Sequence, residues 1–394
     1  MHKKLAIYLI ALISNLGTVL ISPVMADMAL DFPTASAATM GMVVTLPAFT
    51  LIPATILASS VLVTRVERRD IICVAHILSL VGGVLPAFLN SLPLIMVLRG
   101  ILGIGMGLLT PIGITYVSEY PENERASMIG NTQVINCILS AGLLLLVGPV
   151  SRVAGWRGVF LMYGVILIPF IIIMTGIPRT GKLGGGKEKE AAEKTKLGHS
   201  AVTTIVIFCI TLVLSMTVEG AVVSSISFYL ERYELGGAQL ASIASAIGPA
   251  ALAVGAALFS LMMKRFKNWT SVIFLALASV AMFIYSTHTV ATVLIGYCLV
   301  ILMNALYALF TSTIISIVVP IERVALIQSV TLIAMFLGQF IAPTFQAGLG
   351  KLLHTDGADA GVFVIMAIIY VVLTVINIPF KKKAAPESGA AAAS

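Results

Sequence analysis

Twelve long apolar segments, joined by short polar loops, make up most of this 394-residue chain. Each is long enough, at a helical rise of about 1.5 Å per residue, to cross a hydrocarbon core of about 30 Å. Lipid offers no partner to backbone N–H and C=O groups, so such segments must cross as helices. They are expected at residues 5–26, 38–63, 71–90, 92–116, 127–150, 157–177, 200–228, 239–263, 270–287, 290–319, 324–347 and 361–380. The sequence therefore predicts an all-α integral membrane protein with twelve transmembrane helices.

The composition favours this class and excludes others. Apolar residues make up 59% of the chain and charged residues only 10%, against about 25% charged residues in typical soluble domains. The net charge of +7 lies in loops without a nucleic-acid-reading module, so no nucleic-acid partner is expected. The four cysteines lie in separate segments, as small apolar packing residues do. Neither a metal site nor a cofactor is expected.

The basic residues fall mainly on alternate loops. If the N-terminus is cytoplasmic, 19 of the 24 Lys and Arg residues lie in cytoplasmic segments, 4 lie in outer loops, and Arg99 lies within a segment. Loops rich in Lys and Arg stay on the cytoplasmic side of a membrane. The sequence therefore predicts that both termini are cytoplasmic, in a multi-pass protein of a bacterial inner (cytoplasmic) membrane.

The longest hydrophilic stretch, residues 178–199, divides the segments six and six. Its glycines and charges are typical of a flexible linker. Basic loop patterns recur across it at an offset of about 200 residues: Arg65 corresponds to Arg265, and Arg125 to Arg323. Parallel repeats of this kind place a substrate site between the halves. The expected organisation is an N-terminal six-helix half (1–177), a cytoplasmic linker (178–199), a C-terminal six-helix half (200–380) and a cytoplasmic tail (381–394).

Four motifs resemble those of the major facilitator superfamily, and the resemblance covers essentially the whole chain. Residues 60–69 are similar to the family's G-x-L-a-D-R-x-G-R-R loop, with both glycines and the acidic residue replaced. Residues 99–107 resemble its R-x-x-x-G-x-G motif, and residues 155–160 its G-W-R-x-x-F stretch. The Pro-Glu-x-x-Arg-Ala loop at 121–126 also fits. The resemblance implies two halves that alternate access to a central site, and it is nearest to the drug:proton antiporter branch.

Two charged residues lie deep in expected spans, at similar depths: Arg99 and Glu219. A charge there costs at least about 2.5 kcal/mol, so each needs a functional or structural reason. The resemblance implies that their helices line the central cavity, which predicts proton coupling by Glu219 and Arg99 from opposite halves. The alternative is that each satisfies backbone carbonyls or reaches toward the interface. Asp27, at the outer end of the first span, is a further candidate proton site or a solvated helix end.

Basic residues after the second span form a candidate cytoplasmic gate. The resemblance implies that Arg65, Arg68 and Arg69 hold the halves together when the site faces outward. The alternative is that they only set topology and contact lipid headgroups.

Uncharged polar residues recur at helical spacing in spans one, five, ten and eleven. Four such stripes predict one water-filled path, although each could instead hydrogen-bond between helices. The candidate substrate-binding residues are Asn15, Asn136, Asn304, Tyr307 and Gln339. The surrounding segments are rich in Met, Phe, Ile and Ala, which favours amphipathic or aromatic substrates over sugars.

These observations predict a secondary active transporter and not an enzyme. The first hypothesis is proton-coupled efflux of small amphipathic organic compounds or drugs by alternating access, with a small-molecule substrate, protons and the lipid bilayer as partners of a monomer. An alternative is proton-coupled uptake of a small organic anion, with Arg99 as the carboxylate ligand. An alternative of another class is a non-transporting membrane sensor.

Overall fold

The structure, a computed structural model, describes residues 2–10, 12–62, 65–118, 120–177, 199–319 and 321–378. The tail expected at 381–394 and all but the last residue of the linker expected at 178–199 lie outside these residues. The described residues contain helices and no strand. The helices are α1 (His2–Ile10), α2 (Leu12–Val19), η1 (Ser22–Val24), α3 (Met25–Asp31), α4 (Ala37–Leu57), η2 (Ala58–Leu62), α6 (Arg68–Val84), η3 (Leu85–Phe88), α7 (Leu92–Ser118), α8 (Glu122–Leu161), η4 (Met162–Ile166), α9 (Leu167–Gly176), α11 (His199–Arg232), α12 (Ala238–Phe266), η5 (Lys267–Trp269), α13 (Thr270–Tyr285), α14 (Val290–Val318), α15 (Ile321–Leu352) and α16 (Ala360–Asn377).

Eight helical stretches among the described residues are long and apolar enough to cross a membrane. Two shorter apolar helices, Ala238–Leu252 and Thr270–Tyr285, accompany them. One of the eight, Ser127–Gly176, runs through both of the spans expected at 127–150 and 157–177. The predicted all-helical membrane class is therefore confirmed. The number of twelve crossings and the cytoplasmic termini stay predictions.

Gly155 interrupts that longest helical stretch. Its φ of 63° and ψ of −168° are non-helical and kink α8. This φ lies in a region that favours glycine, because a Cβ would crowd the backbone there. The kink lies at the start of the Gly155-Trp156-Arg157 motif, between the two spans expected from the sequence.

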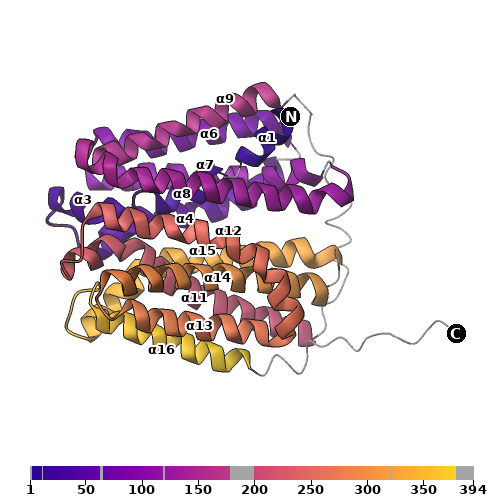
Figure 1. The fold of residues 1–394 in the computed structure, drawn as a ribbon. Helices are drawn as coiled ribbons and strands as arrows, with labels where there is room; N and C mark the ends of the chain where they lie inside the picture. The colour runs from indigo at the N-terminus through magenta and orange to yellow at the C-terminus, as the bar shows by residue number, and fades with distance from the viewer. Residues whose placement is uncertain are drawn as a thin grey trace.

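Buried apolar side chains form two clusters. The first draws on residues between Ala6 and Ile177, together with Ala246 of α12. The second draws on residues between Ile205 and Leu373. In Figure 1 most of the indigo-to-magenta helices lie above the orange-to-yellow ones, and α1 and the last turn of α16 lie toward the right. We call that end of the bundle the terminal end, and the opposite end, where α3 lies, the distal end.

The helices up to α9 and the helices from α11 onward form two parts of the chain. These parts meet along two helix pairs, α8 with α12 and α4 with α15, and α3 and η1 also contact α11. Glycines allow close approach at the distal end. A Cβ on Gly148 would lie 2.8 Å from Cα of Gln239, and one on Gly41 would lie 2.8 Å from Cβ of Pro343. The backbone N–H of Ala26 also donates to Oγ of Ser227 at 3.2 Å. The distal ends of the two parts are therefore packed tightly together.

Candidate functional site

Glu219 lies within α11, half-buried, with its Oε2 atom fully buried. Its carboxyl group interacts with the Asn304 side chain of α14, and the phenols of Tyr297 and Tyr370 are close enough to interact with it electrostatically. Oε2 has no hydrogen-bond partner in the described part of the chain. The ion pairs found there do not include Glu219. A carboxyl group surrounded in this way by neutral polar groups can exist as the uncharged acid.

Asn304 and Tyr370 extend this contact into a hydrogen-bond chain. Nδ2 of Asn304 donates to the Tyr370 hydroxyl of α16 at 2.6 Å. That hydroxyl donates in turn to the Ser215 carbonyl oxygen of α11 at 3.2 Å. Oδ1 of Asn304 is buried and has no partner among the described residues. The chain therefore joins α11, α14 and α16 through one fully buried amide.

Tyr307, one turn beyond Asn304 on α14, is fully buried and makes similar contacts. Its hydroxyl donates to Oδ1 of Asn377 at 3.1 Å, and Nδ2 of Asn377 donates to Thr211 at 3.1 Å. The polar residues of α14 thus bond to α16 and α11 in this conformation. This agrees with the alternative that the polar stripe forms hydrogen bonds between helices. Their predicted contact with substrate is untested.

Arg99 lies in α7 and is fully buried. Its Nε donates to the Val43 carbonyl at 2.8 Å, one terminal nitrogen to the Tyr163 hydroxyl at 2.9 Å, and the other to the Gly17 carbonyl at 2.7 Å. These partners come from α4, η4 and α2. The structure does not bring Arg99 and Glu219 together: Arg99 satisfies backbone carbonyls in the N-terminal part of the chain.

The other substrate-site candidates lie on three helices. Asn136 of α8 is fully buried, and neither its Nδ2 nor its Oδ1 has a partner among the described residues. Ser140, one turn further, is also buried with an unpaired hydroxyl in that part of the chain. Gln339 of α15 is half-buried beside α11, since a Cβ on Gly220 would lie 3.1 Å from its Cα. The Asn15 side chain lies outside the described residues.

Asp27 lies at the distal end, in α3, and accepts a hydrogen bond from Ser151 at 3.2 Å. It lines an open cavity of about 310 Å³, whose other carboxylates are the exposed Glu231 and Glu234. Asp27 is therefore separate from the Glu219 cluster. The described residues hold no group of three or more His, Cys, Asp or Glu side chains placed to bind a metal ion.

The candidate gate arginines lie at the terminal end around the start of α6. Arg65 is exposed. Arg68 is buried, with its guanidinium 4.5 Å from the centre of the Tyr116 ring. Arg69 donates to the Met174 carbonyl at 2.6 Å. These two contacts lie within the N-terminal part of the chain, and a gating role stays a prediction.

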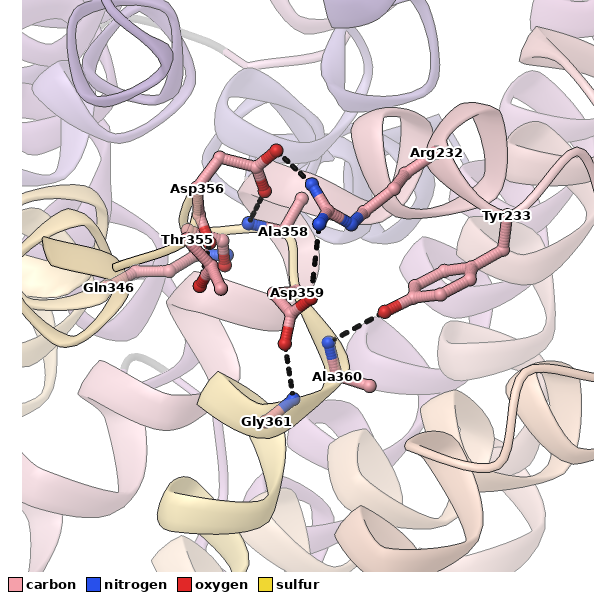
Figure 2. Close-up of polar contacts among 10 residues, drawn as sticks. Arg232, Tyr233, Gln346, Thr355, Asp356, Ala358, Asp359, Ala360 and Gly361 are labelled. Carbon is pink, nitrogen blue, oxygen red and sulfur yellow. Dashed lines mark hydrogen bonds and ion pairs between the residues drawn. The ribbon is translucent and has the colours of Figure 1, made fainter. Parts of the chain in front are cut away.

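Two distal clusters were not identified from the sequence, because their members are far apart in it. Trp156 and Arg157 both donate to Oδ2 of Asp31, at 2.9 and 2.8 Å, and the Arg157 hydrogen bond is the main reason that the pKa of Asp31 is lowered. Figure 2 shows the second cluster, in which Arg232 binds Asp356 and Asp359 beside the start of α16. Both clusters fix helix ends and are not candidate transport sites.

Solved structures with the same arrangement of helices span nearly the whole chain. A D-xylose-proton symporter superimposes with a TM-score of 0.78 at 16% identity, over 97% of this chain and 98% of the other. A POT family transporter in complex with 5-aminolevulinic acid gives 0.78 at 14% identity, over 97% and 96%. A bacterial homolog of the human lysosomal transporter Spinster gives 0.71 at 18% identity, over 97% and 96%. At these identities the likeness establishes the fold alone.

No curated protein matches the chain. A family model does match, over residues 7–343, and it describes the Major Facilitator Superfamily. That match covers far more than half of the sequence and agrees with the loop and helix motifs described above. The chain is therefore a member of the Major Facilitator Superfamily, with a transporter fold.

Proposed function

We propose that this protein is a proton-coupled antiporter that exports small amphipathic organic compounds from a bacterial cytoplasm. Two halves, residues 1–177 and 200–380, rock about a central site, joined by the linker at 178–199. With the terminal end cytoplasmic, the tight distal contacts at Gly41, Gly148 and Ala26 close the outer side.

The setting of Glu219 is the observation that carries the proposal. It is a membrane-embedded carboxyl group whose neighbours are the uncharged Asn304, Tyr297 and Tyr370. No ion pair holds it in the charged form in the described part of the chain. Taking up a proton when buried and releasing it when hydrated is the chemistry that gradient-driven transport needs. The similarity in fold to a D-xylose-proton symporter supports proton coupling on this scaffold.

The bonding of Arg99 favours export of amphipathic compounds over uptake of an organic anion. Binding a substrate carboxylate requires a guanidinium edge with free N–H groups. Three of the five Arg99 N–H groups already donate to Val43, Tyr163 and Gly17, and the side chain is fully buried, so its edge is not presented to a ligand. Apolar contacts between the halves, such as the stacked rings of Phe49 and Phe340 at 4.5 Å, suit an aromatic or amphipathic ligand.

Reconstituted vesicles test the proposal. Purified protein is placed in liposomes with an acidic interior, and a fluorescent amphipathic dye is added outside. We expect dye accumulation that collapses with the pH gradient. Glu219→Gln should abolish accumulation but retain dye exchange without a gradient. Glu124→Gln, which removes an exposed carboxylate paired with Lys4, is the control and should transport normally. Gradient-driven accumulation by Glu219→Gln at the wild-type rate would refute the proton-coupling role.

A further inference from the structure

The junction between α12 and α13 presents exposed basic and apolar side chains next to one another. α12 begins beside Gly148 at the distal end, and its 29 residues extend for about 43 Å, so its last turn lies at the terminal end. There Phe266 is 42% exposed and Trp269 57% exposed, between and after the basic residues. We call this surface the junction patch, and its exposed members are Leu261, Lys264, Arg265, Phe266, Lys267 and Trp269.

The backbone makes a tight reversal at this junction. Lys267 has a φ of 44° and a ψ of −117°, and its N–H donates to the Met263 carbonyl at the end of α12. The Thr270 hydroxyl donates to the Lys267 carbonyl at 2.7 Å and so fixes the start of α13. A positive φ is uncommon and costly for a residue other than glycine. The reversal therefore keeps Lys267 and Trp269 together on one short surface turn.

The three cations of the patch have no local counter-charge. No Asp or Glu occurs in the sequence between Glu234 and Glu322, a stretch that contains all of α12, α13 and α14. In the part of the chain that the structure describes, no ion pair or side-chain hydrogen bond includes Lys264, Arg265 or Lys267. The dipole of α12 favours cations in its last turn, but it does not account for Lys267 or for the exposed rings. The patch therefore suits an anion from outside the chain.

The corresponding loop of the N-terminal part, after the second span, differs in this respect. Its Arg68 is buried, and its Arg69 donates to the Met174 carbonyl at 2.6 Å. That loop also carries its own acidic residues, Glu67 and Asp70. The rule that basic loops stay cytoplasmic applies to both loops alike, so it does not explain why the cations of only one are all exposed.

We propose that the junction patch binds the headgroup of an anionic phospholipid from the surrounding bilayer. Its three basic side chains contact the headgroup phosphate, on which an Arg guanidinium can place two parallel hydrogen bonds. Its apolar side chains lie against the upper acyl chains, and the indole lies at headgroup level, as interfacial Trp residues do. A zwitterionic lipid carries its own cation, so a cluster of three cations selects a lipid with net negative charge. Neither the transported compound nor the coupled proton enters this inference.

Quenching of Trp269 fluorescence by brominated lipids tests the proposal in the full-length protein in nanodiscs. The chain has two Trp residues, so Trp156→Phe makes Trp269 the single probe, and all proteins compared carry this change. Brominated phosphatidylglycerol and brominated phosphatidylcholine are supplied at equal mole fractions. We expect the anionic lipid to associate at Trp269 about fivefold more strongly or better, because each Lys or Arg near an anionic surface contributes about that factor. Equal quenching by the two lipids would overturn the proposal.

A charge-neutral variant assigns the preference to the patch. Combining Lys264→Gln, Arg265→Gln and Lys267→Gln should remove the preference for the anionic lipid. The melting temperature should stay that of the parent, because these exposed side chains make no ion pair in the described structure. Arg65→Gln is the matched control, an exposed cation of the corresponding loop, and should keep the preference. A triple variant that still prefers the anionic lipid would contradict the assignment.

Soluble phosphate distinguishes a lipid headgroup from a free anion. Sodium phosphate and sodium chloride at the same ionic strength screen the patch equally, so both should weaken the lipid preference to the same extent. A larger loss with phosphate than with chloride would show that the patch binds free phosphate, and would overturn the lipid as its ligand.

Discussion

Arg99 and Tyr163 donate hydrogen bonds to the same carbonyl oxygen, that of Gly17, at 2.7 and 2.8 Å, and Arg99 also donates to the Tyr163 hydroxyl. With the Arg99 bond to Val43, one guanidinium ties α7 to α2, α4 and η4. A charge buried in this way is compensated by several acceptors at once, which explains how it is tolerated inside the bundle.

The main effect of replacing Arg99 should therefore be a lower thermal stability of the fold, and not a change in proton coupling. Arg99→Lys keeps the charge but lacks the planar fork, so at least one of its three acceptors loses its donor, at about 1–3 kcal/mol. We expect a lower melting temperature in detergent, and a larger fall for Arg99→Ala. Arg152→Lys, at an exposed position on α8, is the control. Wild-type melting of Arg99→Lys would show that these bonds do not hold the helices together.

Cysteine reactivity should distinguish the stripe on α14 from that on α8. In a background lacking the four native cysteines, Asn136→Cys should react with a small water-soluble thiol reagent, because an amide with no protein partner calls for water or ligand beside it. Asn304→Cys should stay inert, because Asn304 is enclosed with Tyr370. Substrate should protect Asn136→Cys. Equal reactivity at both positions would contradict this assignment.

Gly148 should control closure of the distal end. In Gly148→Ala the new Cβ meets backbone of α12, at Cα of Gln239, so the two helices must separate. Pulsed electron paramagnetic resonance should then show a longer distance between spin labels at the exposed positions Leu30 and Leu352. Gly142→Ala is the matched control on the same helix, where a Cβ meets nothing within 4 Å. The same distance in both variants would mean that α8 and α12 do not limit closure.

Low pH should weaken the ion pair between Asp31 and Arg157. The lowered pKa of Asp31, due first to the Arg157 hydrogen bond, means that the ionised form stabilises the fold. This stabilisation is complete above the ordinary Asp pKa of about 3.9. It is lost as the pH falls through the lower pKa that Asp31 has in the folded protein. Asp31→Asn should reduce the melting temperature slightly at pH 7, with the difference from wild type narrowing toward acid. Arg157 also donates to Asn90, so Arg157→Gln has a loss of its own, but the double variant should lose less than the sum of the two single variants. Full additivity would argue against the pair.

The sequence by itself determined that this is an all-helical membrane protein. Runs of apolar residues about 20 long have one stable form in lipid, so span positions depend on local composition. The motifs that begin at Arg99 and Gly155 also indicated the family, and the family model that matches residues 7–343 confirms it. The sequence separated the spans at 127–150 and 157–177, and the structure puts the kink at Gly155 between them.

Only the tertiary structure decided which way the polar side chains point. The same stripe of Asn304 and Tyr307 can face a cavity or a neighbouring helix, depending on rotation of α14 about its axis. Packing against α16 decided this, and it put Tyr370 beside Asn304. Likewise, the cost of burying Arg99 predicted that it must be satisfied, but its partners Val43, Tyr163 and Gly17 come from three distant segments. Such partners follow from the packing of helices, which no local pattern encodes.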